Sequence, residues 1–146
     1  MSQPRVVICG VARTPIGSFL GTLSSMTAVE LGVATVKELC DRVGIDTSSG
    51  IVDELLFGQV LQAGCGQNPA RQVALGAGLP VSIGATTINK VCGSSLKAAM
   101  MAANSITAGK SKVVIAGGTE SMSNAPQLLV GQRKGRKMGD STLVDS

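Results

Sequence analysis

Short apolar runs alternate along this chain with segments that have the apolar spacing of helices. Four runs have the length and composition of strands, at residues 5–10, 53–60, 86–91 and 112–116. Helical patterns lie between them, at residues 27–44, 68–78 and 93–109. The order β-α-β-α-β-α-β predicts an α/β fold with a mainly parallel sheet, right-handed crossovers and helices on both faces. Functional sites in such sheets lie at the carboxyl ends of the strands.

Residues at the ends of the helical patterns support these boundaries. Thr27 and Glu30 have the spacing of a capping box, and Gly44 is typical of a helix end. Asn68 followed by Pro69 is typical of an N-cap and a first helical residue. In the first helix, apolar residues recur at helical spacing at Val29, Val33, Val36, Leu39 and Val43.

Composition argues against several classes of function. Aromatic residues make up only 1% of the chain, so nucleic-acid binding by base stacking is not supported. The net charge is +4, and four basic groups fall within residues 133–137. That stretch is either a solvated loop or a patch that attracts an anionic ligand such as a phosphorylated cofactor. The N-terminus lacks a signal-peptide pattern and no apolar stretch is long enough to span a bilayer, so we expect a cytoplasmic protein without membrane or nucleic-acid partners.

The four cysteines do not form a metal or redox motif. None of Cys9, Cys40, Cys65 and Cys92 belongs to a C-x-x-C pattern, and the chain has no histidine, so we expect free thiols and no metal site. Cys9 and Cys40 are predicted to be packing residues. Cys65 lies between two glycines and is interpreted as a surface thiol, with a reactive thiol as the alternative.

Cys92 stands where the third strand pattern meets the third helix. A sulfur at the positive end of a helix is favoured as thiolate, which is the nucleophilic form. Small residues follow it, so the first N–H groups of the helix could also bind an oxyanion. The alternative is a buried, inert cysteine at a helix start. A cysteine nucleophile usually needs a histidine base, so the chain by itself would hold half of an active site.

Glu120 follows the fourth strand pattern and a pair of glycines, at the same predicted sheet edge as Cys92. We interpret it as a structural carboxylate that accepts backbone N–H bonds, with a general base as the alternative. The glycines around it do not fit the dinucleotide or Walker patterns. They are typical of a tight turn close to another backbone.

The segment around Cys92 resembles the nucleophile signature of thiolases. Three further segments agree with that family in order and spacing. The four segments that carry the resemblance are residues 13–17, 62–72, 89–98 and 116–126. The motifs are most like those of the acetyl-CoA acetyltransferases. The resemblance implies that Cys92 attacks the thioester of one acetyl-CoA and passes the acetyl group to a second, which forms acetoacetyl-CoA, or that it catalyses the reverse thiolysis. It also implies that the Cys92 backbone N–H belongs to an oxyanion hole.

The resemblance further implies what lies outside this sequence. In the family, a C-terminal half-domain supplies the catalytic histidine, a second cysteine and much of the contact with coenzyme A, which is a substrate thioester and no separate cofactor. Residues 1–122 would be the N-terminal half-domain and residues 123–146 the start of a loop domain. The complete protein is expected to be a homodimer or homotetramer, with residues 65–72 as a candidate subunit contact. Ser95 departs from the glycine that many members carry there.

Two other functions remain open. One is a 3-ketoacyl-CoA thiolase that degrades longer acyl chains. The other is a non-catalytic acyl-CoA-binding or scaffold module, which would bind acyl-CoA without forming an adduct at Cys92.

Overall fold

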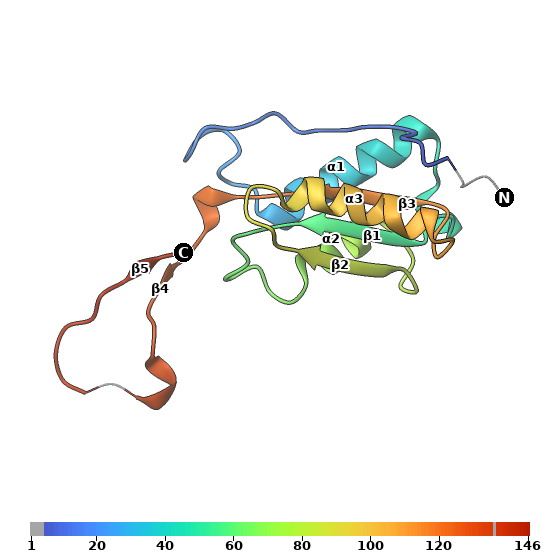
Figure 1. Cartoon of the computed structure of the whole chain (residues 1–146). Helices are drawn as coiled ribbons and strands as arrows, with labels where there is room; N and C mark the ends of the chain where they lie inside the picture. The colour runs from blue at the N-terminus through green and yellow to red at the C-terminus, as the bar shows by residue number, and fades with distance from the viewer. Residues whose placement is uncertain (1–4, 136) are drawn as a thin grey trace.

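The computed structural model describes residues 5–135 and 137–146. Figure 1 shows a small sheet with helices on both of its faces and an arm that extends away from it. The helices and strands are α1 (Ala28–Val43), β1 (Glu54–Gly58), α2 (Pro69–Gly76), β2 (Gly84–Ile88), α3 (Ser94–Thr107), β3 (Val114–Gly118), β4 (Gln127–Leu128) and β5 (Val144–Asp145). Short 3-10 turns lie at Thr47–Ser49, Met122–Asn124 and Gln132–Lys134.

The central sheet is parallel, with β1 between β2 and β3. Leu56 of β1 pairs with Thr86 on one side and Ala116 on the other. The predicted α/β fold with a parallel sheet is therefore confirmed. All three strands end at the same edge, which is where the sequence places Cys92 and Glu120.

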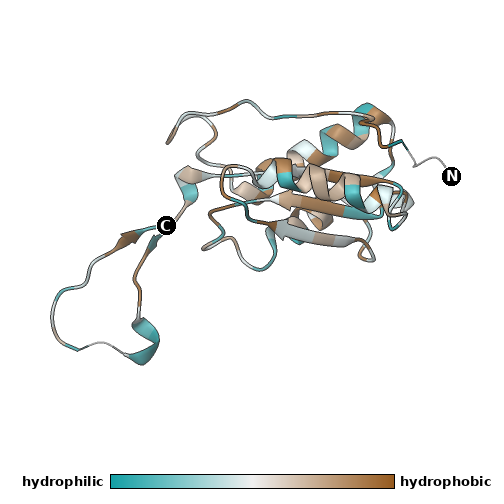
Figure 2. Cartoon of the chain, viewed as in Figure 1, coloured by the Kyte–Doolittle hydropathy of each residue, from teal (hydrophilic) through white to brown (hydrophobic). Residues whose placement is uncertain are grey.

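Alternating residues of β1 form two separate cores. Leu55 and Phe57 pack with Val36 of α1 and Val73 of α2 on one face. Leu56 packs against α3 on the other face, together with Ala98 and Ala102. Figure 2 shows β1 brown along most of its length, as expected for a strand that is covered on both sides. The prediction of helices on both faces is confirmed.

The prediction of a strand at residues 5–10 is wrong. This segment is extended but pairs with no strand of the described residues, and Ile8 is 86% exposed. The segment passes the C-terminal end of α1, where a Cβ on Gly10 would lie 3.3 Å from Leu39. An apolar run predicts extended backbone, but a strand also needs a neighbouring backbone to pair with, and residues 5–10 pass α1 instead of either open edge of the sheet, on β2 and β3.

The predicted apolar stripe of α1 lies on its packed side, since Val36 is buried and Val29 and Leu39 pack against the core, but small residues share that side. Its buried residues are Ala28, Leu31, Gly32, Val36 and Cys40. A Cβ on Gly32 would lie 2.6 Å from Val73 and 3.2 Å from Phe57. The helix therefore also packs closely through Gly32, a contact that a pattern based on large apolar side chains does not reveal.

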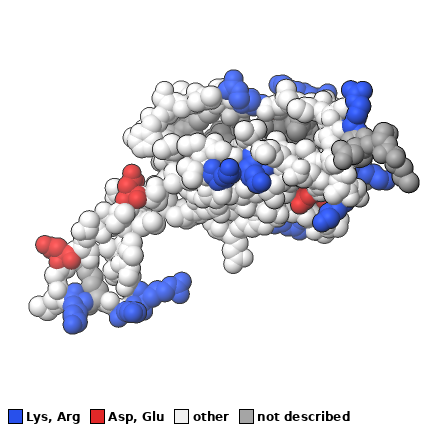
Figure 3. Space-filling model, in the orientation of Figure 1, with Lys and Arg blue, Asp and Glu red and all other residues white. Residues whose placement is uncertain are grey.

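The arm begins after Met122–Asn124 and consists of the antiparallel pair β4 and β5 with a long connection between them. Figure 3 shows Lys and Arg side chains at its far end. Arg133, Lys134 and Lys137 are exposed, as the interpretation of a solvated loop requires, whereas Arg136 lies outside the described residues. No helix within the described part of the chain is long and apolar enough to cross a membrane.

Candidate active site

Cys92 lies in the turn between β2 and α3, at the carboxyl edge of the sheet, and its side chain is exposed. The N-cap of α3 is Gly93, which has no side chain to bond the first N–H groups of the helix. The N–H groups of Gly93 and Ser94 donate to the Lys90 and Val91 carbonyls, at 3.0 and 3.1 Å, so the N–H groups of Ser95 and Leu96 are the ones available to an anion near Cys92. The predicted position of the cysteine, between a strand and a helix start, is confirmed.

Two glycines allow the start of α3 to sit directly on the strand ends. A Cβ on Gly58 of β1 would lie 2.7 Å from the backbone of Ser94 and Ser95. A Cβ on Gly118 of β3 would overlap the Ser95 hydroxyl and would lie 2.7 Å from the Gly58 carbonyl oxygen. Any side chain at either position would push the helix, and Cys92 with it, away from the sheet.

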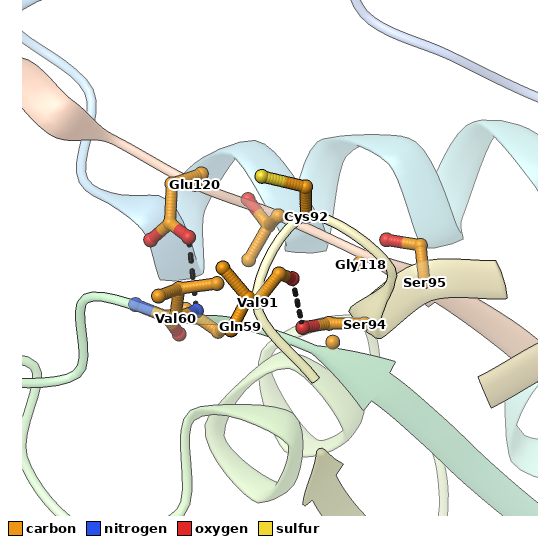
Figure 4. Close-up of a pocket in the computed structure, with 10 residues that line it drawn as sticks. Gln59, Val60, Val91, Cys92, Ser94, Ser95, Gly118 and Glu120 are labelled. Atoms are coloured by element: carbon orange, nitrogen blue, oxygen red, sulfur yellow. Dashed lines mark hydrogen bonds between the residues drawn. The ribbon is translucent and has the colours of Figure 1, made fainter. Parts of the chain in front are cut away.

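The residue before Cys92 has an unusual backbone conformation. Val91 has a φ of 49°, in the left-handed region that β-branched residues avoid. Such a conformation costs about 1–3 kcal/mol and persists only where the surroundings impose it. The Ser94 hydroxyl donates to the Val91 carbonyl at 2.6 Å, drawn as a dashed line in Figure 4. The amide oxygen of Asn89 accepts from the Val91 N–H at 3.0 Å. Residue types alone give no signal for this turn.

The strand ends, this turn and the loop after β3 surround a cavity of about 330 Å³. Figure 4 shows its lining, which includes both Cys92 and Glu120. A second cavity of about 420 Å³ lies between residues 14–19 and the loop after β3, and Glu120 lines it as well. The predicted meeting of Cys92 and Glu120 at one sheet edge is therefore confirmed.

Glu120 connects the loop after β3 to the loop after β1. One carboxylate oxygen accepts from the Val60 N–H at 2.9 Å, and the other accepts from the Leu61 N–H at 3.2 Å. The prediction of a structural carboxylate is confirmed. Because both oxygens are engaged, Glu120 would have to give up a backbone bond in order to act as a base.

The other cysteines have different surroundings. Cys40 is buried as predicted, and burial raises the pKa of its thiol. The prediction that Cys9 is a packing residue is wrong, because its segment lies exposed along α1 instead of inside a sheet. Cys65 is half-buried: its sulfur lies 3.2 Å from the amide nitrogen of Gln59 and 3.5 Å from the Leu61 carbonyl. These contacts anchor its loop beside the cavity, so the thiol is not simply a surface group.

Comparison with known proteins gives a consistent result over the whole chain. Residues 6–146 match the family described as the N-terminal domain of thiolase. The cytosolic acetyl-CoA acetyltransferase ERG10 of Gibberella zeae is 59% identical over 142 residues, which are 97% of this chain and 35% of that protein. An acetyl-CoA acetyltransferase of Cupriavidus necator is 53% identical over 141 residues, again 97% of this chain and 35% of that protein.

A solved structure agrees with these relatives. The Acat5 thiolase from Ascaris suum, in complex with coenzyme A, superposes with a TM-score of 0.85 and is 42% identical. The match covers 94% of this chain and 35% of that one. The chain thus spans about a third of the length of the curated relatives that it matches.

Proposed function

The chain belongs to the thiolase family, and on that premise we propose that the whole protein is an acetyl-CoA C-acetyltransferase whose nucleophile is Cys92. The observation that carries the proposal is the exposed thiol of Cys92 at the start of α3, in the wall of a cavity at the carboxyl edge of the sheet. The relatives named acetyl-CoA acetyltransferases share half or more of the aligned residues, which supports this activity over other acyl transfers.

The proposed reaction has two acyl-transfer steps. The Cys92 thiolate attacks the carbonyl carbon of acetyl-CoA, and the oxyanion that forms collapses with departure of the coenzyme A thiolate, which takes up a proton. A second acetyl-CoA then loses an α-proton, and its carbanion attacks the acetyl-cysteine. Acetoacetyl-CoA forms and Cys92 leaves as the thiolate. Sulfur suits both steps because the acetyl group moves between thiols of similar leaving ability.

The N-terminus of α3 would stabilise the oxyanion of each step. Gly93 has no side chain to cap the N–H groups of Ser95 and Leu96, and the Cys92 N–H lies in the preceding turn. Fixed N–H donors beside a developing negative charge are the usual form of an oxyanion hole. Coenzyme A enters this scheme as part of the substrate and leaves as a product.

The remaining groups would come from outside these 146 residues. The chain has no histidine, so the base for Cys92 and the group that handles the α-proton belong in this proposal to a C-terminal half-domain. Residues 1–122 would form the N-terminal half-domain and residues 123–146 the start of a loop domain, where the arm leaves the sheet. We propose that the whole protein is a homodimer or homotetramer and that it acts in the cytoplasm. The relative that is named cytosolic supports this location.

The test is the intact mass of the whole protein before and after exposure to acetyl-CoA. We expect one acetyl group per subunit, lost in Cys92→Ala and retained in Cys9→Ala, which removes another exposed thiol. Acetoacetyl-CoA should then form from acetyl-CoA with the unaltered protein and with Cys9→Ala, but not with Cys92→Ala. Acetyl-CoA binding without acetylation of Cys92 would overturn the proposal and favour a scaffold role. A light-scattering mass of a single subunit would contradict the proposed assembly.

A further inference from the structure

We propose that Ser94 is a positioning residue for Cys92: its hydroxyl holds the left-handed turn at Val91 and so fixes the peptide that carries the nucleophile. The proposal rests on the function proposed above, since it assigns Ser94 a part in presenting Cys92 to an acyl-CoA. Ser94 itself is 4% exposed and lies beneath the turn, with its helix start packed against Gly58.

The left-handed conformation of Val91 must be stabilised by other groups, because it is unfavourable for valine. A β-branched side chain at a φ of 49° collides with its own backbone. The Val91 side chain is 65% exposed, so apolar packing does not compensate for this strain. Hydrogen bonds to the backbone on either side of Val91 are therefore what retains the conformation.

Ser94 supplies two of these bonds with one oxygen. Its hydroxyl donates to the Val91 carbonyl at 2.6 Å and accepts from the Lys90 N–H at 2.9 Å. The Ser94 backbone N–H also donates to the Val91 carbonyl, at 3.1 Å. The side chain thereby links the peptide before Lys90 and the peptide after Val91 to the first residue of α3. The peptide between Lys90 and Val91 is held instead by Asn89 and by the Gly93 N–H.

The bond to the Val91 carbonyl bears directly on the proposed chemistry. This carbonyl belongs to the same peptide unit as the Cys92 N–H, and the peptide is trans. In a planar trans peptide the C=O and N–H point in opposite directions. By holding the Val91 carbonyl, the Ser94 hydroxyl therefore also fixes the orientation of the Cys92 N–H. The hydroxyl thus acts on both the sulfur and a proposed oxyanion donor, together with the bonds from the backbone N–H groups of Gly93 and Ser94.

A double-substitution cycle in the whole protein separates this role from simple packing. Ser94→Ala removes the hydroxyl, and Val91→Gly removes the strain that the hydroxyl opposes, because glycine adopts positive φ freely. The four proteins of the cycle are compared by the rate at which acetyl-CoA acetylates Cys92. Ser105→Ala is the matched control: it removes another hydroxyl of α3, which is bonded to Ser111, 2.9 Å away, at the far end of the helix.

We expect Ser94→Ala to slow acetylation of Cys92 about 10- to 100-fold, as displacement of a reacting group does. In the Val91→Gly background the same change should slow it less than about threefold, because the two positions are coupled. Ser105→Ala should leave the rate unchanged. An equal loss in both backgrounds, or no loss in either, would overturn the proposal. If Ser94→Ala does not fold, the double variant decides: a folded, reactive double variant supports the proposal and an unfolded or unreactive one overturns it.

Alkylation by iodoacetamide, followed at Cys92 by peptide mass mapping, distinguishes this proposal from the function on which it rests. The reagent reaches the thiol without an acyl-CoA site. If Cys92 of the unaltered protein is alkylated but never acetylated, the proposed function fails. The alkylation rates of the four proteins then decide the role of Ser94 by the same comparison of the two backgrounds.

Discussion

At the scale of single residues, the position of Cys92 depends on neighbours that have no side chain. Gly58 and Gly118 let the first turn of α3 rest on two strand ends, with no room for a Cβ at either place. The glycines therefore set how deeply the nucleophile sits at the sheet edge. This is a steric role, since neither Gly58 nor Gly118 has a positive φ.

Gly58→Ala should accordingly harm both stability and reactivity. The added Cβ would meet the Ser94 and Ser95 backbone at 2.7 Å, so we expect a loss of about 1–3 kcal/mol in the free energy of unfolding. The rate of Cys92 acetylation should fall as well, because α3 moves. Gly84→Ala is the control: this glycine also lies in a strand, but its Cβ would meet only Glu54, at 4.0 Å. Equal effects of the two substitutions in urea unfolding would contradict the steric argument.

Glu120→Gln distinguishes the structural carboxylate from a general base. A carboxylate accepts both the Val60 and Leu61 N–H groups, whereas an amide presents an NH₂ group to one of them. We expect the substitution to lower the free energy of unfolding by about 1–3 kcal/mol. The rate of Cys92 acetylation should fall in part. Glu38→Gln, which breaks an exposed ion pair with Arg42, should cost less than about 1 kcal/mol. Abolished turnover with unchanged stability would instead identify Glu120 as a base.

The sequence alone identifies the residues whose chemistry or conformational preference is local. Cys92 stands out because a β-branched run meets a run of small residues there, and Glu120 because it follows a strand and two glycines. Val91 and Ser94 give no such signal. Valine favours extended backbone, so its left-handed conformation is imposed by tertiary hydrogen bonds that no local pattern encodes.

At the scale of elements, the helices were predictable and the first strand was not. The capping box of Thr27 and Glu30 is present, Gly44 ends α1 in the left-handed region, and Asn68 accepts from the N–H of Arg71 at the start of α2. These signals act within one turn of backbone. A strand depends on a distant partner, which is why residues 5–10 have strand composition without forming one. The short pairing of β4 with β5 was missed for the same reason.

Asp53 joins two neighbouring strands in a way that depends on pH. Its carboxylate accepts from the N–H groups of Lys112 at 2.6 Å and Val113 at 2.9 Å, which ties the start of β1 to the approach to β3. These bonds, above all the one from Val113, lower the pKa of Asp53 in the folded protein. A lowered folded-state pKa stabilises the fold fully above the unfolded pKa, and this stabilisation is lost as the pH falls through the folded value.

Asp53→Asn should therefore destabilise the protein near neutral pH and matter less in acid. The difference in unfolding free energy between Asp53→Asn and the unaltered protein should be largest above about pH 4, the unfolded value of an aspartate, and should shrink at lower pH. Urea unfolding at a series of pH values measures it. A difference that stays constant down to the acid limit would mean that the charge of Asp53 does not contribute through these bonds.

At the scale of the whole molecule, the surface of these 146 residues is unusually apolar outside the two cores. Leu96 and Met100 are 69% and 54% exposed and lie one turn apart on the outer side of α3. Ile8 and Ile16, on the N-terminal segment, are also exposed. Monomeric proteins rarely leave such surface in water. Since the chain spans about a third of its relatives' length, we interpret the outer side of α3 as a face that the rest of the whole protein covers.

Residues 1–146 expressed alone should then associate through α3. We expect a light-scattering mass above that of one chain, reduced toward it by Leu96→Lys combined with Met100→Lys, because lysine retains the helix but not the apolar contact. Val81→Lys is the matched control: Val81 is also exposed and apolar, but lies in a loop outside α3. In the whole protein, the same double substitution should lower stability, because it would place two charges in a covered interface. A single-chain mass for the unaltered piece would contradict association through α3, and an unaffected whole protein would mean that α3 faces solvent there.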